Sequence, residues 1–279
     1  MIRRLLRFHA FVLSIAFASS LQPAVAGPPD SSASGVVWFP ARALFPHLAA
    51  DGTGQHLSLN KDLQTRQIFG SIGGLQRLAE TGLAGFPVQV GIAATVNGSF
   101  IKTPSVLNVV TVDFFVNVPV DVRISDRLSL RTGWGHYSAH LADDGVEAVG
   151  RHSINYAKDY IPLLAALSVL PNEGFLYGGA RIDYFTIPAR GKHLILQAGA
   201  ETGSIPLAGG LAAYGAVDLR CRQEAAWGTT QSYQLGLRLL SQAPRGIRLA
   251  YTHRTGIEER GQFYDQRLTC NLVGIFLDF

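Results

Sequence analysis

The chain has 279 residues, with 24 lysines and arginines against 20 aspartates and glutamates. Arg3, Arg4 and Arg7 account for the excess, because removing these three leaves 24 − 3 = 21 basic residues. This balance predicts no nucleic acid partner. Hydrophobic residues make up 47% of the chain, yet no apolar run reaches the roughly 20 residues of a transmembrane helix.

Residues 1–26 have the pattern of a secretory signal peptide. The three arginines precede an apolar run from Ala10 to Ala18, and Ala24, Val25 and Ala26 provide the small residues before a cleavage site. We therefore expect export by a cleaved signal peptide. The residue directly after the expected cleavage site is Gly27 and not a cysteine, so a lipoprotein anchor is not expected.

A short segment, residues 27–53, separates the signal peptide from the first expected strand. Residues 27–34 are rich in proline, glycine and serine and are typical of a flexible lead. Residues 36–51 are aromatic and proline-rich but too short for a domain. We expect this periplasmic N-terminal segment to pack at the barrel rim or to insert as a small plug.

Hydrophobicity alternates with a period of two along much of the remaining chain. Near the C-terminus, Val273, Ile275, Leu277 and Phe279 fall on one face of a strand. Residues 211–222 and 233–240 alternate in the same way, with charged or polar side chains on the second face. Lipid offers no hydrogen bonds to the backbone, so a closed barrel with apolar residues outside satisfies this pattern. The terminal aromatic residue also resembles the C-terminal signature of bacterial outer-membrane barrels.

Residues 54–279 are therefore predicted to form one all-β, antiparallel, transmembrane outer-membrane β-barrel. Even strand numbers are usual, so about twelve strands are expected, with ten or fourteen as alternatives. A soluble β-sandwich or lipocalin-like barrel is the other alternative, in which the apolar face would turn inward. The expected partners are outer-membrane lipids or lipopolysaccharide, and the barrel-assembly machinery during insertion. The expected strands are 54–60, 66–73, 86–98, 106–119, 126–141, 149–170, 174–186, 192–203, 210–222, 228–241, 246–255 and 264–279.

Several short motifs are similar to those of one known family. They are Trp38-Phe39-Pro40, Leu44-Phe45-Pro46, Leu48-Ala49-Ala50-Asp51, His136-Tyr137-Ser138-Ala139-His140-Leu141-Ala142-Asp143 and Ile154-Asn155-Tyr156-Ala157-Lys158-Asp159. With these motifs the chain resembles the uncharacterised outer-membrane proteins of domain-of-unknown-function family 1207. The resemblance implies a barrel but no reaction, so function has to be argued from a site.

The most distinctive stretch of the chain, GWGHYSAHLADDG, places His136, Ser138 and His140 at every second position. Side chains at this spacing share one face of a strand. Arg127 and Arg131 fall on the opposite face, which is expected to be the lumen. His136, Ser138 and His140 are thus expected to face lipid near the outer-leaflet surface.

A lipid-facing His-x-Ser pair resembles the site of outer-membrane phospholipase A and of lipid A 3-O-deacylase, where a neighbouring Asn or Glu orients the histidine. The resemblance implies a lipid acyl-ester hydrolase with His136 as general base and Ser138 as nucleophile. Spacing does not select the third residue. Along the expected strand 149–170, the phase places Asn155 and Asp159 in the lumen. The candidate orienting or binding residues are His140, Asp143, Asp144, Glu147, His152 and Asn155.

Non-catalytic interpretations remain open for the same stretch. Its polar residues could bind lipopolysaccharide phosphates, hold calcium with Asp143 and Asp144, or cap the strand. No other cofactor is implied. The second function class is accordingly a non-catalytic barrel for envelope structure, lipid or lipopolysaccharide binding, or small-solute passage.

Two further expectations concern the lumen and the cysteines. Arginines with acidic neighbours are expected to fill the lumen with ion pairs rather than to line an open channel. Cys221 is expected outside and Cys270 inside the barrel, which disfavours a disulfide. The expected lumenal charges are Arg127, Arg131, Arg220, Arg222, Arg238, Asp159 and Asp218.

Overall fold

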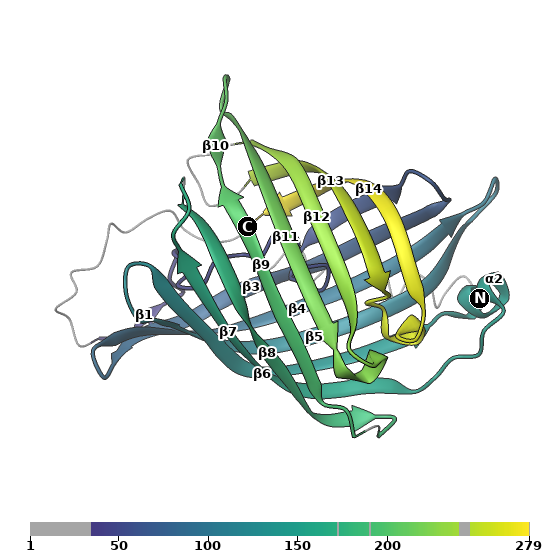
Figure 1. Cartoon of the computed structure of the whole chain (residues 1–279), viewed down its shortest axis with the longest axis horizontal. Helices are drawn as coiled ribbons and strands as arrows, with labels where there is room; N and C mark the ends of the chain where they lie inside the picture. The colour runs from purple at the N-terminus through teal and green to yellow at the C-terminus, as the bar shows by residue number, and fades with distance from the viewer. Residues whose placement is uncertain (1–34, 172, 190, 240–245, 279) are drawn as a thin grey trace.

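The computed structural model describes residues 35–171, 173–189, 191–239 and 246–278. The expected signal peptide, the flexible lead and Phe279 lie outside this part of the chain. The described residues form an antiparallel sheet that closes on itself as a twelve-stranded barrel (Figure 1). The strands of the ring are β2 (Leu57–Asp62), β3 (Gln67–Leu83), β4 (Phe86–Lys102), β5 (Leu107–Arg123), β6 (Leu128–Leu141), β7 (Tyr156–Ser168), β8 (Glu173–Ile187), β9 (Leu194–Gly203), β11 (Leu211–Arg222), β12 (Gly228–Leu239), β13 (Gly246–Ile257) and β14 (Arg267–Asp278).

Each ring strand pairs with the next along the chain, and β14 pairs with β2, so the ring has no free edge. Two short strands lie outside the ring: β1 (Val37–Trp38) pairs with β3, and β10 (Ile205–Pro206) pairs with β11. The described residues contain no helix that is long and apolar enough to cross a membrane.

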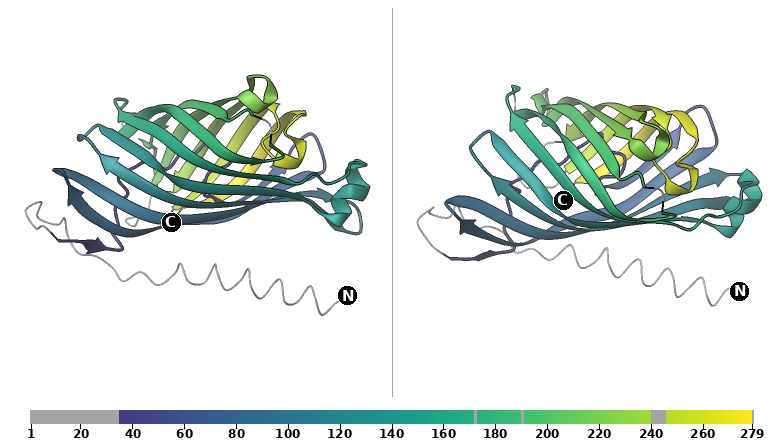
Figure 2. Two further views of the ribbon diagram at one scale, coloured as in Figure 1. Left: turned by 90° about the horizontal axis from the view of Figure 1, so that it is seen from below. Right: turned by 60° about the horizontal axis from the view of Figure 1, so that its bottom comes forward.

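The two ends of the barrel differ. At one end, the loop end, the strands are joined through α2 (Asp143–Val149), η2 (Gln223–Ala225) and η3 (Gly261–Phe263). At the other, the hairpin end, β14 finishes and the N-terminal segment enters. Figure 2 shows the tilted strands running between these two ends, with α2 at the edge of the loop end.

Every strand expected from the sequence is present, with two notable differences in bounds. β3 continues to Leu83 instead of ending near 73, and it turns tightly into β4. β7 begins at Tyr156 rather than at 149. The reason is that residues 143–149 form helix α2, which Gly150 ends in the left-handed conformation at φ 62°.

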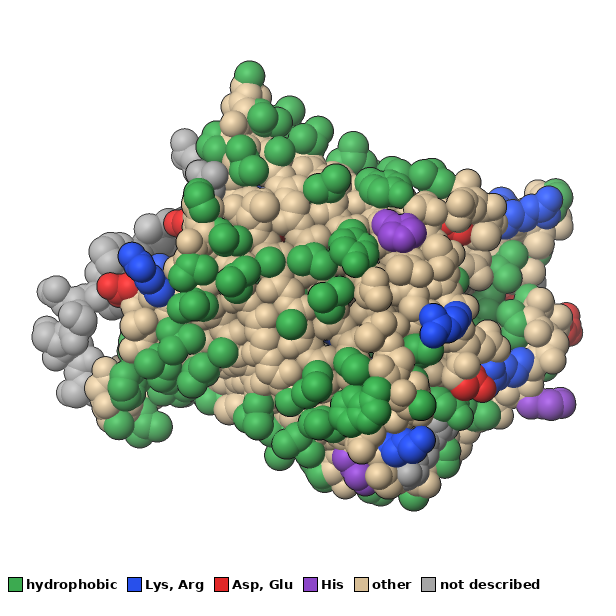
Figure 3. Space-filling view, in the orientation of Figure 1, with side chains coloured by type: hydrophobic (Ala, Val, Ile, Leu, Met, Phe, Trp, Pro, Cys, Tyr) green, Lys and Arg blue, Asp and Glu red, His purple; other side chains and the backbone are tan. Residues whose placement is uncertain are grey.

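Side chains along each ring strand alternate between the lumen and the outer surface. On β5, Val112, Phe114 and Val116 face outward, whereas Asp113 and Phe115 are buried inside. Figure 3 shows hydrophobic side chains spread over the outer surface in view. This is the arrangement expected of a barrel surrounded by lipid, and the reverse of a soluble barrel. The exposed apolar residues of this outer belt include Ile72, Ile92, Leu130, Ile161, Leu163, Leu196, Leu219, Leu235, Leu249 and Ile275.

The lumen is filled largely by charged side chains in pairs, as expected. Arg248 is fully buried and forms an ion pair with Asp278. Arg127, by contrast, does not face the lumen as predicted, because β6 begins one residue later and Arg127 lies exposed in the preceding turn. The other lumenal ion pairs include Arg131–Asp121, Lys158–Asp183, Lys158–Glu224, Arg181–Asp183, Arg220–Asp218, Arg238–Glu201, Arg254–Glu259 and Arg260–Glu258.

The N-terminal segment enters the lumen from the hairpin end, and we call residues 41–56 the plug. Its Phe45 and Leu48 pack against Phe175 and Tyr177 of β8. Asp51, near its tip, forms an ion pair with Arg220 of β11. The plug is therefore held by apolar contacts and by an ion pair with the lumenal wall.

The loop between β13 and β14 closes the lumen from the loop end. Gln262 is fully buried, and its amide nitrogen donates hydrogen bonds to the carbonyl oxygens of Ala139 and Ile154 at 2.6 and 2.8 Å. Its amide oxygen accepts the Ile154 N–H at 3.0 Å. Gly261 donates its N–H to the Tyr137 hydroxyl at 2.6 Å. This inward-folded loop lies directly behind the part of β6 that carries the histidine and serine motif.

Candidate functional site

The motif residues of β6 lie on the outer surface, near the loop end. His136 and Ser138 are half-buried and His140 is exposed, whereas the intervening Tyr137 and Ala139 are buried in the lumen. The alternation of the strand thus places all three polar side chains on the outer face of the barrel, as the sequence pattern indicates. The site lies outside the barrel and not in its lumen.

Two glycines allow β6 to pack closely against its neighbours just below this site. A side chain at Gly135 would collide with the Tyr160 ring, which covers the strand from the lumen. Gly133 has φ 134°, and a Cβ there would lie 2.1 Å from the Val118 carbonyl oxygen. Both positions therefore require glycine, which explains the GWG at the start of the motif.

The structure pairs His136 with an acid that the sequence reasoning placed wrongly. Asp159 lies directly opposite His136 in the β6–β7 register, and its Oδ1 is 2.6 Å from His136 Nδ1. The two side chains are 37% and 26% exposed, respectively. Asp159 was expected in the lumen but lies on the outer face. The prediction assumes that side chains alternate regularly through residues 151–155. These residues are not part of β7, so the prediction assigns the two faces of β7 the wrong way round.

On the outer surface, His136 has Asp159 beside it on β7 and Ser138 two residues farther along β6. When Asp159 accepts a hydrogen bond from Nδ1, the imidazole keeps its proton there and Nε2 carries the lone pair. Ser138 follows on the same face, roughly 7 Å away between Cα atoms. Its direct neighbours across the sheet are Phe114 on β5 and Ala157 on β7.

Aromatic side chains surround this group. The Trp134 ring is stacked near the His136 ring, with centroids 6.4 Å apart and planes inclined by 22°. Trp134 Nε1 donates a hydrogen bond to the Tyr184 hydroxyl on β8 at 2.8 Å. Tryptophan and tyrosine are the residues enriched at membrane–water interfaces. The polar group thus lies at the edge of the apolar belt.

The remaining candidate residues lie farther along the chain, toward the loop end. Asp143 and Asp144 open α2, where Asp144 accepts the Val109 N–H at 3.3 Å. Glu147 is on the same helix, and His152 and Asn155 are exposed in the connection to β7. Among the described residues, no group of three or more His, Cys, Asp or Glu side chains could hold a metal ion.

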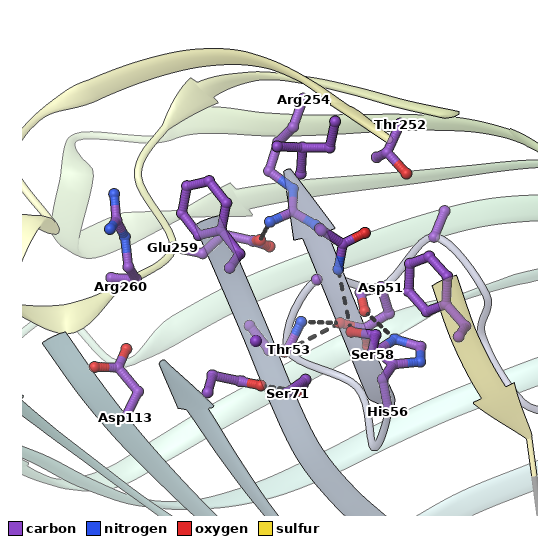
Figure 4. A pocket seen from close by; sticks show the side chains of 18 of the residues that line it. Asp51, Thr53, His56, Ser58, Ser71, Asp113, Thr252, Arg254, Glu259 and Arg260 are labelled. Carbon is purple, nitrogen blue, oxygen red and sulfur yellow. Dashed lines mark hydrogen bonds and ion pairs between the residues drawn. The ribbon is translucent and has the colours of Figure 1, made fainter. Parts of the chain in front are cut away.

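Within the described residues, the lumen has a cavity on each side of the tip of the plug. A cavity of about 860 Å³ surrounds the plug toward the hairpin end. A smaller one of about 80 Å³ lies between the plug and the β13–β14 loop. Figure 4 shows this second cavity, with Asp51 and His56 of the plug on one side and Glu259 and Arg260 of the loop on the other. Neither cavity is lined by His136 or Ser138.

Both cysteines are free. Cys221 lies on the outward side of β11, and its Sγ donates a hydrogen bond to the Trp227 carbonyl at 3.1 Å. Cys270 is buried on the lumenal side of β14. The expected opposite orientations of the two thiols are therefore observed.

Fold and surface together define a closed antiparallel barrel with an apolar exterior and a polar lumen that holds the plug. The chain belongs to the DUF1207 family, described as proteins of unknown function, whose family model matches residues 46–279. No curated protein matches the chain. Among solved structures, the chain is similar to the beta domain of the Bordetella autotransporter BrkA. The two are 14% identical, with a TM-score of 0.38, over 81% of this chain and 97% of that one.

Proposed function

We propose that this protein is a bacterial outer-membrane barrel that hydrolyses acyl esters of lipids in the outer leaflet. The apolar outer belt supports insertion in a membrane, because such a surface is costly to expose to water. With an even number of strands, both barrel termini lie at the hairpin end, which faces the periplasm in barrels of this class. The loop end, and with it the Ser138 site, then faces outward.

The observation that carries the hydrolase proposal is the 2.6 Å contact between Asp159 and His136 on the lipid-side face, two residues from Ser138. A carboxylate–histidine pair activates a serine whose hydroxyl comes within hydrogen-bond reach of the free imidazole nitrogen. Ser138, two residues along on the same face, is the serine placed to do so. In the lumenal ion pairs described above, the acids are paired with arginine or lysine. The outward acid at this site pairs with a histidine instead.

The chemistry follows from these three side chains. His136 Nε2 takes the hydroxyl proton of Ser138 while Oγ attacks the ester carbonyl carbon. Asp159 stabilises the resulting imidazolium through Nδ1. Collapse of the tetrahedral intermediate breaks the ester C–O bond, and the leaving alkoxide takes the proton from His136. Water then repeats the sequence on the acyl-serine and releases a carboxylic acid.

The position of the group suits a lipid substrate. Acyl chains would lie along the belt below Trp134, where Leu130, Ile161 and Leu163 are exposed. The ester groups of a lipid lie at the level of the aromatic interface, between its hydrocarbon and its headgroup. Water reaches the same level from the loop end. Small-solute passage, the alternative activity, has less support because the plug and the β13–β14 loop both occupy the lumen.

Hydrolysis by the refolded barrel tests the proposal. Full-length mature protein in micelles is offered a long-chain p-nitrophenyl ester and a diacyl glycerophospholipid, with calcium or with a chelator. We expect release of nitrophenol and fatty acid, and a loss of about 10³-fold or more in Ser138→Ala. The matched control is Ser129→Ala, a lumenal serine on the same strand. Equal rates in wild type and Ser138→Ala, with either substrate, would overturn the proposal.

A further inference from the structure

His140, the third member of the motif, has no part in the Asp159–His136–Ser138 group. It is exposed and lies two residues beyond Ser138 on the same face of β6. Its ring meets Phe114 edge-on, with centroids 5.7 Å apart and planes inclined by 72°. Phe114 is the residue directly opposite Ser138 on β5. His140 is thus in contact with the residue that lies across from the serine.

A hydrolase at this place needs a donor for the oxyanion of its tetrahedral intermediate. Backbone N–H groups usually provide it, but here they are engaged elsewhere. Ser138 pairs with Phe114 on one side and with Ala157 on the other, so β6 is an interior strand whose amides belong to the ladders. A side chain on the outer face can supply the donor instead. His140 is the side chain with N–H groups that follows Ser138 on the outer face.

We propose that His140 is a catalytic residue that donates a hydrogen bond to the oxyanion formed at Ser138. This inference rests on the proposed hydrolase function. As Ser138 Oγ bonds to the carbonyl carbon, the π electrons of the carbonyl move to its oxygen, and the negative charge develops there. The N–H of His140 stabilises this charge while His136 holds the serine proton. Phe114 positions His140, and the two histidines act from opposite sides of the nucleophile.

The test separates transition-state stabilisation from substrate binding. Wild type, His140→Ala and His140→Gln are assayed with the long-chain p-nitrophenyl ester and with dodecylboronic acid as inhibitor. The boronic acid accepts Ser138 Oγ at boron, the serine proton passes to His136, and the tetrahedral adduct mimics the oxyanion. His253→Ala, which removes a half-buried histidine on the outer face of β13, on another wall of the barrel, is the control.

We expect His140→Ala to lower kcat by about 10²-fold and to weaken boronate inhibition by a similar factor, with KM unchanged. His140→Gln, which keeps a neutral N–H donor, should recover part of both losses, and His253→Ala should behave as wild type. A wild-type kcat in His140→Ala would overturn the inference. A rise in KM as large as the weakening of boronate inhibition would also overturn it, because His140 would then bind substrate and transition state equally. Wild-type activity in Ser138→Ala would instead overturn the proposed function itself, so the two failures are distinguishable.

Discussion

Asp159 on β7 holds His136 on β6 through a 2.6 Å contact on the outside of the barrel. The two residues are direct partners in the antiparallel register, so the backbone itself brings the carboxylate to the imidazole. Cross-strand neighbours on one face have their Cβ atoms about 4.5–5.5 Å apart, which suits a short contact between an aspartate and a histidine. The pair is thus fixed by the barrel wall and needs no mobile loop.

Replacing Asp159 should impair His136 as a general base, although the imidazole itself stays in place. In Asp159→Ala the imidazole loses the partner that fixes its tautomer and stabilises its charge, so kcat for ester hydrolysis should fall by about 10²–10⁴-fold. Initial rates with the p-nitrophenyl ester measure this loss. The matched control is Asp126→Ala, an exposed aspartate in the turn before β6, which should hydrolyse at the wild-type rate. An active Asp159→Ala variant would remove Asp159 from the mechanism.

The β13–β14 loop should open when its buried anchor is removed. Gln262→Ala leaves the carbonyls of Ala139 and Ile154 and the Ile154 N–H without their partner. Each buried group left unsatisfied costs about 1–3 kcal/mol. Hydrogen exchange should therefore quicken across residues 258–266 while the strands stay protected. Gln64→Ala, in an exposed turn, serves as the control. Unchanged protection of the loop would contradict the anchoring role of Gln262.

The ion pair between Asp51 and Arg220 should hold the plug in the lumen. In Asp51→Ala, Arg220 keeps its partner Asp218, but the plug loses its charged contact with the lumenal wall and should be held more weakly. Single-channel recording in planar bilayers should show little conductance for wild type and frequent openings for Asp51→Ala. Glu147→Ala, which removes an exposed acid on α2, is the control. A closed Asp51→Ala barrel would mean that the apolar contacts of Phe45 and Leu48 suffice to retain the plug.

The plug should also loosen in acid, through His56. Burial is the main factor that lowers the pKa of His56, to about 4, and Arg248 lowers it further, whereas Asp51 and Asp278 act in the opposite direction. In a released plug the pKa returns to 6.5. Docking is therefore at full strength above pH 6.5 and weakens as the pH falls from 6.5 toward 4, where only the released form takes up the proton.

Channel openings recorded across this pH range measure the effect. Wild type should open increasingly below pH 6.5. His56→Gln should respond less, because glutamine keeps a donor for the Asp51 carbonyl that His56 Nε2 contacts at 2.8 Å, yet cannot be protonated. The neighbouring His47, whose ring lies 4.9 Å from that of His56, remains in both proteins. A pH response of equal size in the variant would rule out His56 as the sensor.

The alternation of side chains was enough to predict the barrel. Each strand has its own outward apolar set, such as Val112, Phe114 and Val116, so the period of two identifies the strands and their faces without tertiary information. The same rule placed His136 and Ser138 outside. It failed for Asp159 because residues 143–155 form a helix and an irregular connection, and phase cannot be carried across a segment that is not a strand.

Long-range contacts were beyond what the sequence could predict. The entry of Gln262 into the lumen depends on where three unrelated backbone groups of β6 and the β6–β7 connection come to lie, and no local pattern encodes that. The pairing of His136 with Asp159 likewise depends on the register between β6 and β7. A search for outward-facing acids on the strand after the motif would have found Asp159 once the start of β7 was known.

Covalent labelling of the serine tests the central assignment most directly. A long-chain alkyl fluorophosphonate is incubated with the refolded barrel in micelles, and the modified peptide is identified by mass spectrometry. Because only an activated hydroxyl displaces fluoride at a useful rate, the triad predicts a stable phosphonyl adduct on Ser138, with labelling lost in His136→Ala and in Asp159→Ala. An unmodified Ser138 in the wild-type barrel, or equal labelling of Ser138 in wild type and His136→Ala, would contradict it.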